Sequence, residues 1–203
     1  MKTRVRSSSG FAFRVVVGLA LLIGLTTGSA AAETRMHHIG LGFGYSKLLS
    51  DDLDPDRTFG LDFTDCAMGG LSYRISISRT FDAVFDSRST FSRQEALGDD
   101  VHFTTSWFGP GLRIRAAEGN IRPYAQANFY FAQEEFSIDS GSTTTSTDES
   151  GVGFGFFSGV DIRVSRLISI PVEIAYLYAD PEDNISSFGG GAGVTFNFGK
   201  VID

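Results

Sequence analysis

The sequence predicts an all-β fold, an eight-stranded antiparallel up-and-down transmembrane β-barrel. Three observations predict it. Apolar and polar residues alternate with a period of two along eight segments, the second face of these segments is rich in glycine, and short and long links alternate between them. The composition agrees, because the 203 residues include 24 glycines and 19 phenylalanines, which together suit strands better than helices.

Residues 1–32 have the pattern of a cleaved secretory signal peptide. Four basic residues precede an apolar core at residues 15–25, and small residues follow as far as Ala32. We expect cleavage between Ala32 and Glu33. An uncleaved membrane anchor is the alternative, but this apolar core would extend only ~16 Å as a helix, about half of a bilayer core. The predicted domains are therefore a signal peptide, residues 1–32, and a barrel domain, residues 33–203.

The first four strands are predicted at residues 37–47, 59–75, 80–92 and 102–115. Their apolar residues share one face: Ile39, Leu41, Phe43, Tyr45, Phe59, Leu61, Phe63, Leu71, Tyr73, Ile75, Phe81, Ala83, Phe85, Phe108, Leu112 and Ile114. Val84 interrupts the alternation of the third strand. Pro110 cannot donate a ladder hydrogen bond in the fourth, so we expect a β-bulge at residues 108–111.

The last four strands are predicted at residues 121–136, 151–164, 168–178 and 188–198. Their apolar face contains Ala125, Ala127, Phe129, Phe131, Val152, Phe154, Phe156, Val160, Ile162, Val164, Ile168, Ile170, Val172, Ile174, Tyr176, Tyr178, Phe188, Ala192, Val194, Phe196 and Phe198. Each predicted strand has the ~9–11 residues that a tilted strand needs to cross a bilayer.

The glycine-rich second face sets the expected orientation. Glycines 40, 42 and 44 lie in the first strand, 151, 153, 155 and 159 in the sixth, and 189, 191 and 193 in the eighth. Glycine gives an exposed strand no solvation advantage, but small residues fit inside a narrow closed barrel. We therefore expect the bulky apolar face to contact lipid, the reverse of a soluble barrel.

The links between the strands also alternate. Short links are predicted at residues 76–79, 116–120 and 165–167, longer ones at 48–58, 93–101 and 137–150, and one of intermediate length at 180–185. Short periplasmic turns and longer extracellular loops are typical of outer-membrane barrels, so both chain ends are expected in the periplasm.

Four short segments carry a resemblance to a known family. They read GLGFGY at residues 40–45, GPGLR at 109–113, IRPYA at 121–125 and GGGAGVTFNF at 189–198. In their order and spacing the chain resembles the outer-membrane β-barrel domain family of Gram-negative bacteria, the small porin-like and OmpA/OmpX-like barrels. Members usually end in an aromatic residue that acts as an assembly signal, whereas here five residues follow Phe198.

Charged residues on the predicted lumen face form the candidate site. They include Arg74, Asp82, Arg113, Asp161, Arg163 and Glu173. Because a buried charge must be paired, we expect a network of ion pairs and hydrogen bonds that holds the wall shut. The alternative is that several of these residues face periplasmic water at the rim.

Composition limits the partners. A net charge of −7, from 17 basic and 24 acidic residues, argues against nucleic acid. The single cysteine, Cys66, excludes an internal disulfide framework and a multi-cysteine zinc site, and no cofactor or metal is expected. The four outer links hold thirteen acidic and two basic residues, which are interpreted as solvated loops or, alternatively, as a place for divalent cations.

The expected function is a structural or surface-interaction role in the outer membrane, without enzymatic activity. A small channel or transport accessory, a lipid-modifying enzyme and a soluble periplasmic ligand-binding barrel are the alternatives. The histidines are His37, His38 and His102. The first two are expected at the periplasmic start of the first strand, away from outer-leaflet lipid, and no particular serine or acid is marked as a partner for His102. Outer-membrane lipid and the barrel assembly machinery are the expected partners, and the expected state is a monomer.

Overall fold

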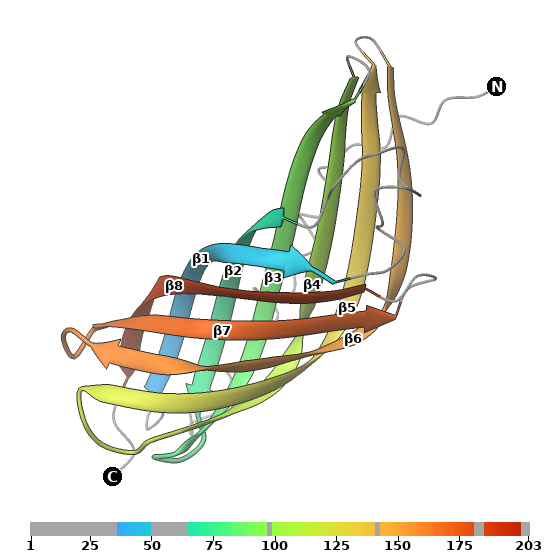
Figure 1. Ribbon diagram of the computed structural model, residues 1–203. Helices are drawn as coiled ribbons and strands as arrows, with labels where there is room; N and C mark the ends of the chain where they lie inside the picture. Colours follow the sequence, from blue (N-terminus) through green and yellow to red (C-terminus); the bar gives the residue numbers. More distant parts are fainter. Residues whose placement is uncertain (1–35, 50–64, 97–98, 141–142, 181–184, 200–203) are drawn as a thin grey trace.

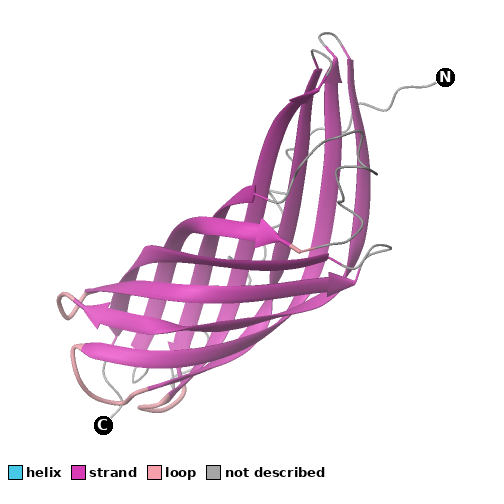
Figure 2. Cartoon of the chain, in the orientation of Figure 1, coloured by secondary structure: helices cyan, strands magenta, loops and turns pink. Residues whose placement is uncertain are grey.

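The computed structural model describes residues 36–49, 65–96, 99–140, 143–180 and 185–199, which form one closed antiparallel barrel (Figures 1 and 2). The strands are β1 (Met36–Leu48), β2 (Asp65–Ser76), β3 (Phe81–Ala96), β4 (Asp99–Arg115), β5 (Ile121–Ser140), β6 (Thr143–Arg163), β7 (Ile168–Asp180) and β8 (Ile185–Gly199). Each strand pairs with the next, and β8 pairs with β1 to close the ring. The predicted fold class is confirmed. Among the described residues, no helix is long and apolar enough to cross a membrane.

The two faces of the strands have the predicted orientation. In β1, Phe43 is 74% exposed on the outside, whereas Ser46 is fully buried inside. In β8, Phe196 is 47% exposed and its neighbour Thr195 is 1% exposed. Val84, which interrupts the apolar pattern, faces the lumen and is buried, so β3 keeps its alternation. A continuous outer surface of large apolar side chains requires lipid as its solvent.

The predicted bulge at residues 108–111 is wrong. Phe108 pairs with Phe131 and Gly111 pairs with Asn128, three residues further along on both strands, so neither strand contains an extra residue. Gly109 and Pro110 lack Cα partners on β5 but stay in register with β3. Because Pro110 has no N–H, the ladder between β4 and β5 is interrupted at Gly109 and Pro110. The pairing of the same two residues with β3 is intact and preserves the register.

The outer ends of four strands are longer than predicted. The links expected at residues 93–101 and 137–150 shrink to residues 97–98 and 141–142, because β3 to β6 continue as two hairpins. Serine and β-branched threonine in these segments allow extended backbone. β5 has 20 residues and β6 has 21, about twice what a tilted crossing strand needs.

Figure 1 shows β3, β4, β5 and β6 rising together beyond the ends of the other strands, on one side of the barrel. The opposite end of the barrel has short turns at residues 77–80, 116–120 and 164–167. The predicted lipid-facing residues Phe59, Leu61 and Phe63 lie outside the described residues.

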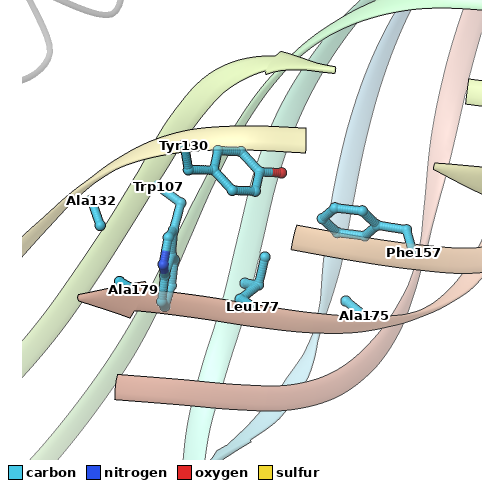
Figure 3. Packing of buried hydrophobic residues seen from close by; sticks show 7 residues of the cluster. All are labelled: Trp107, Tyr130, Ala132, Phe157, Ala175, Leu177 and Ala179. Carbon is cyan, nitrogen blue, oxygen red and sulfur yellow. The ribbon is translucent and has the colours of Figure 1, made fainter. Parts of the chain in front are cut away.

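The two walls of the lumen differ in side-chain size. On one wall, Gly42 of β1 lies between Gly70 of β2 and Gly193 of β8 in the ladder. A Cβ atom at Gly70 would lie 2.6 Å from Cδ of Arg88, so the missing side chain makes room for this arginine. The other wall supplies four large inward side chains from β4 to β7: Trp107, Tyr130, Phe157 and Leu177. Figure 3 shows them packed with three alanines, Ala132, Ala175 and Ala179.

Candidate functional site

An ion triplet lies in the lumen near the short turns. Arg74 of β2 and Arg113 of β4 both donate to Oδ2 of Asp161 on β6, at 3.2 Å and 3.3 Å. All three side chains are buried. β2 and β6 are four strands apart in either direction around the ring, so the Arg74–Asp161 pair spans the lumen from wall to wall.

A second group lies beside it, at the ends of β1 to β4. Arg115 donates from Nε to Oδ2 of Asp82 at 2.9 Å and from Nη2 to Oγ of Ser76 at 3.0 Å. The Ser76 hydroxyl donates to Oδ1 of Asp82 at 2.8 Å. The His38 ring lies between Ser76, 3.1 Å from its Nε2, and Asn197, 2.6 Å from its Nδ1. These contacts connect β8, β1, β2, β3 and β4 on one level.

A third group lies next to the aromatic cluster of Figure 3. Arg88 of β3 pairs with Asp86 at 2.9 Å and reaches Oε1 of Glu173 on β7 at 2.5 Å. β3 and β7 are also opposite strands, so this pair crosses a second diameter of the lumen. Tyr124 donates to Oε2 of Glu173 at 2.5 Å, and Tyr130 donates to Oδ2 of Asp86 at 2.6 Å.

Aromatic rings and amides complete the packing around the guanidinium groups. The Arg88 guanidinium lies 4.7 Å from the centre of the Phe157 ring, and that of Arg113 lies 3.7 Å from the centre of the Tyr124 ring. Arg113 also donates to Gln126 at 2.7 Å. These contacts satisfy several donors of each arginine at once, which a buried cation requires.

The six residues predicted as a charge network have different environments. Arg74, Arg113 and Asp161 are in direct contact, Asp82 pairs with Arg115, and Glu173 pairs with Arg88. Arg163 is half-buried on the lumen side of β6 and forms no ion pair with another described residue. The three groups are adjacent clusters, not one chain of ion pairs.

Several members of the site cannot be identified from the sequence. Arg88 lies on the polar face of the third strand, but nothing in the sequence pattern places it in the network or indicates a partner for Tyr124 and Tyr130. The role of the two tyrosines is seen only from their contacts with Glu173 and Asp86. An odd or even position in a strand predicts the face on which a side chain lies, but not which residue it reaches across the lumen.

The space between the charged groups of the described lumen is small. A cavity of about 20 Å³ lies among the charged groups and the glycine wall, bordered by Gly42, Gly70, Arg88, Glu173 and Gly193. This volume suits one or two water molecules. Above it, Trp107 and Tyr130 are fully buried in the aromatic cluster.

The other residues considered for chemistry lie apart. His37 stacks on Tyr73 and Phe198 on the outer surface of the barrel, and His102 stacks on Phe91 in the long hairpins. Cys66 is buried in an apolar cluster with Leu48, Val101, Phe103 and Ile185. Across the described parts of the chain, no three His, Cys, Asp or Glu side chains are grouped as a metal site would need.

The sequence and the structure both match known proteins. Residues 17–198 match the family described as outer membrane protein beta-barrel domain. Neisserial surface protein A is similar in structure, with 17% identity, 80% of this chain and 97% of that chain covered, and a TM-score of 0.61. No curated protein matches the sequence.

Two further structures are similar. The Yersinia pestis attachment invasion locus protein Ail, solved with the heparin analogue sucrose octasulfate, has 15% identity, 81% and 99% coverage of this and that chain, and a TM-score of 0.56. OprG of Pseudomonas aeruginosa has 12% identity, 82% and 97% coverage, and a TM-score of 0.53. At these identities the likeness concerns the fold.

Proposed function

This chain belongs to the outer membrane protein β-barrel domain family, and from this premise we propose that it is a non-enzymatic surface-interaction protein of the outer membrane. The observation that carries the proposal is the one-sided extension of β3 to β6. The barrel wall itself needs about half of the length of β5 and β6, so the outer halves of these strands are available for contacts outside the membrane.

The extension has a sheet edge suited to contacts with another molecule. β7 ends at Asp180, which pairs with Val152 of β6. This is the outermost pair between the two strands. Residues 143–151 of β6 pair with β5 and with no other described strand. Such an edge presents backbone donors and acceptors to a partner.

The charge of the extension favours a cationic partner. Between Arg122 and Arg163 the chain contains no lysine or arginine, and it contains Glu135, Asp139 and Glu149 in the outer hairpin. The structure of Ail was solved with an anionic heparin analogue. Like charges repel, so the acidic hairpins of this chain do not favour the same ligand.

The filled lumen argues against the channel alternative. Two ion pairs cross it along different diameters, and the aromatic cluster lies directly above them. An eight-stranded barrel has an interior just wide enough to be filled by side chains, and here it is filled.

The contacts of Ser76 argue against a hydrolytic enzyme. Ser76, His38 and Asn197 are residue types found in acyl-transfer sites, and they lie in a row. However, the Ser76 hydroxyl donates its proton to Asp82 and its oxygen accepts from Arg115. The oxygen is therefore not activated by the imidazole, and all of these groups are buried.

Export and assembly complete the proposal. Residues 1–32 act as the signal peptide, and the mature chain begins at Glu33 and inserts as a monomer with the help of the barrel assembly machinery. The mature protein isolated from outer membranes is therefore expected to give an N-terminal sequence starting at Glu33. An N-terminus before residue 15 contradicts cleavage.

The test shortens one outer hairpin without moving the barrel register. Glu134 and Glu149 are directly opposite in the ladder, so residues 135–148 can be replaced by Asn-Gly, a two-residue turn that suits a hairpin. A control replaces residues 94–101 by Asn-Gly between the paired Arg93 and His102.

Both variants are expected to remain folded, as shown by heat-modifiable gel mobility. Binding of intact cells to a surface coated with an unstructured lysine-rich peptide is expected to fall with the first variant, and to fall less with the control. If both variants bind as the wild type does, while a deletion strain becomes sensitive to detergent, the role is structural and not surface interaction.

A further inference from the structure

The charges inside the barrel do not balance. Between the short turns and the aromatic cluster, six arginines face the lumen: Arg74, Arg88, Arg113, Arg115, Arg122 and Arg163. Four carboxylates face them: Asp82, Asp86, Asp161 and Glu173. The contacts described above assign these carboxylates to Arg74, Arg88, Arg113 and Arg115. Two cations remain, Arg122 and Arg163.

These two arginines lie close together at the end of the lumen that holds the short turns. Arg122 of β5 is directly opposite Asp161 of β6, and Arg163 lies two residues beyond Asp161 on the same inward face. The backbone N–H of Arg163 donates to the carbonyl of Asn120 at 2.7 Å, which fixes this end of the ladder. Diagonal neighbours at this spacing are within reach of long side chains.

Within the described residues, neither guanidinium forms an ion pair at contact distance with a carboxylate. Asp161 lies opposite Arg122, but its Oδ2 accepts from Arg74 and Arg113 instead. Nε of Arg122 is buried and makes no hydrogen bond to the described chain. Arg115 and Arg163 repel Arg122 electrostatically, whereas the carboxylates of Asp161 and Asp82 attract it from further away than hydrogen-bond distance. Glu118, in the adjacent turn, is exposed to solvent.

We propose that Arg122 and Arg163 form a binding site for a phosphate-type oxyanion at the periplasmic end of the lumen. Two guanidinium groups on neighbouring strands offer planar pairs of N–H donors, and a tetrahedral oxyanion accepts such pairs with charge-assisted hydrogen bonds. The anion supplies the negative charge that the four carboxylates leave short. This site is on the opposite side of the membrane from the proposed surface-interaction hairpins and does not depend on them.

Two sources supply this chemistry: a phospholipid headgroup of the periplasmic leaflet and free phosphate. The test uses protein purified from outer membranes in an uncharged detergent and freed of lipid. Binding of inorganic phosphate is followed by phosphorus NMR line broadening. Retention of added phosphatidylglycerol is measured by native mass spectrometry.

The double variant Arg122→Gln/Arg163→Gln is compared with the control Arg79→Gln/Arg166→Gln, which removes two arginines from exposed turns at the same end and changes the net charge equally. The first is expected to bind the anion roughly tenfold more weakly or worse, since it loses the charge-assisted hydrogen bonds of both guanidinium groups. The control is expected to bind as the wild type does.

Each outcome decides the proposal. Phosphate binding that only the first variant loses supports a site for a free anion. If the wild type does not bind free phosphate but retains phosphatidylglycerol, and only the first variant loses this retention, the site binds a lipid headgroup. Equal behaviour of the two variants in both measurements overturns the proposal. If the glutamine variant fails to fold, Arg122→Lys/Arg163→Lys replaces it. That variant keeps the charge but loses the paired donors, so binding as tight as that of the wild type also overturns the proposal.

Discussion

Glu173 shows how single residues close the lumen. Its two carboxylate oxygens accept from Arg88 of β3 and from Tyr124 of β5, so one side chain of β7 joins three strands across the interior. Both partners are buried, and removing the charge leaves Arg88 with Asp86 as its remaining carboxylate. A buried cation that loses a partner destabilises the folded state more than the loss of an exposed pair.

We therefore expect Glu173→Gln to lower the free energy of unfolding by roughly 3 kcal/mol. The measurement is thermal unfolding in detergent, followed by the loss of heat-modifiable gel mobility. The matched control is Asp100→Asn, which removes the carboxylate from the exposed Arg93–Asp100 pair and is expected to cost less than about 1 kcal/mol. Equal midpoints for Glu173→Gln and the wild type would remove the charge groups from any central role in closing the barrel.

Glycine at position 155 has a packing function that can be tested in the same way. A Cβ atom there would lie 2.5 Å from Tyr130, 2.8 Å from Leu177 and 3.0 Å from the Phe157 ring. Gly155→Ala is therefore expected to overpack the aromatic cluster and to cost about 1–3 kcal/mol. Gly69→Ala is the control, since a Cβ atom at Gly69 has no neighbour within 4 Å. A Gly155→Ala protein as stable as the control contradicts tight packing of the cluster.

The sequence predicted which residues of the site face the lumen, but not their pairing. The period-two alternation predicts that Arg74, Asp161 and Glu173 face the lumen, because every second residue of a strand lies on the same face. Which of these residues meet across the lumen depends on how far the strands are shifted relative to one another, and the alternation carries no information about that shift. The apolar residues Trp107 and Phe157 face inward on the polar parity, so the sequence pattern gave no sign of an aromatic cluster inside the barrel.

At the scale of strands, sequence reasoning placed all eight elements, and it was weakest at their outer ends. The period-two pattern of apolar residues is shorter in the outer parts of the strands, where Val101, Phe103, Phe136 and Ile138 are interspersed with serine, threonine and acidic residues. The outer halves of β5 and β6 contain serine, threonine and acidic residues, which read as loops. Their continuation as hairpins depends on cross-strand pairing with β4 and with each other.

The seam between the first and last strands depends on an aromatic contact. His37 and Phe198 are directly paired in the ladder, and their rings stack with centres 5.5 Å apart. Phe198→Ala is expected to cost about 1 kcal/mol and to slow closure of the ring. The measurement is the rate at which the heat-modifiable form appears on refolding into detergent. Phe188→Ala, an outward phenylalanine at the other end of β8, is expected to close faster than Phe198→Ala. If the two variants close at the same rate, the contact has no special part in the seam.

The described part of the barrel is a cylinder whose interior is filled by side chains. The charge groups occupy the end of the lumen that holds the short turns, the aromatic cluster lies next to them, and a cavity of about 20 Å³ lies among the charge groups. In a planar lipid bilayer we therefore expect no stepwise conductance from the purified protein, under conditions in which a general porin gives clear steps. Reproducible steps from the wild type, abolished by heat denaturation, would instead favour the channel alternative.

Two ion pairs join opposite sides of the ring, one from β2 to β6 and the other from β3 to β7. Each ion pair holds two opposite strands at a fixed distance. Two such pairs along different diameters are expected to oppose a flattening of the barrel to an elliptical cross-section under lateral pressure. A pull on the outer hairpins is therefore expected to tilt the barrel as a rigid body more than it bends the wall.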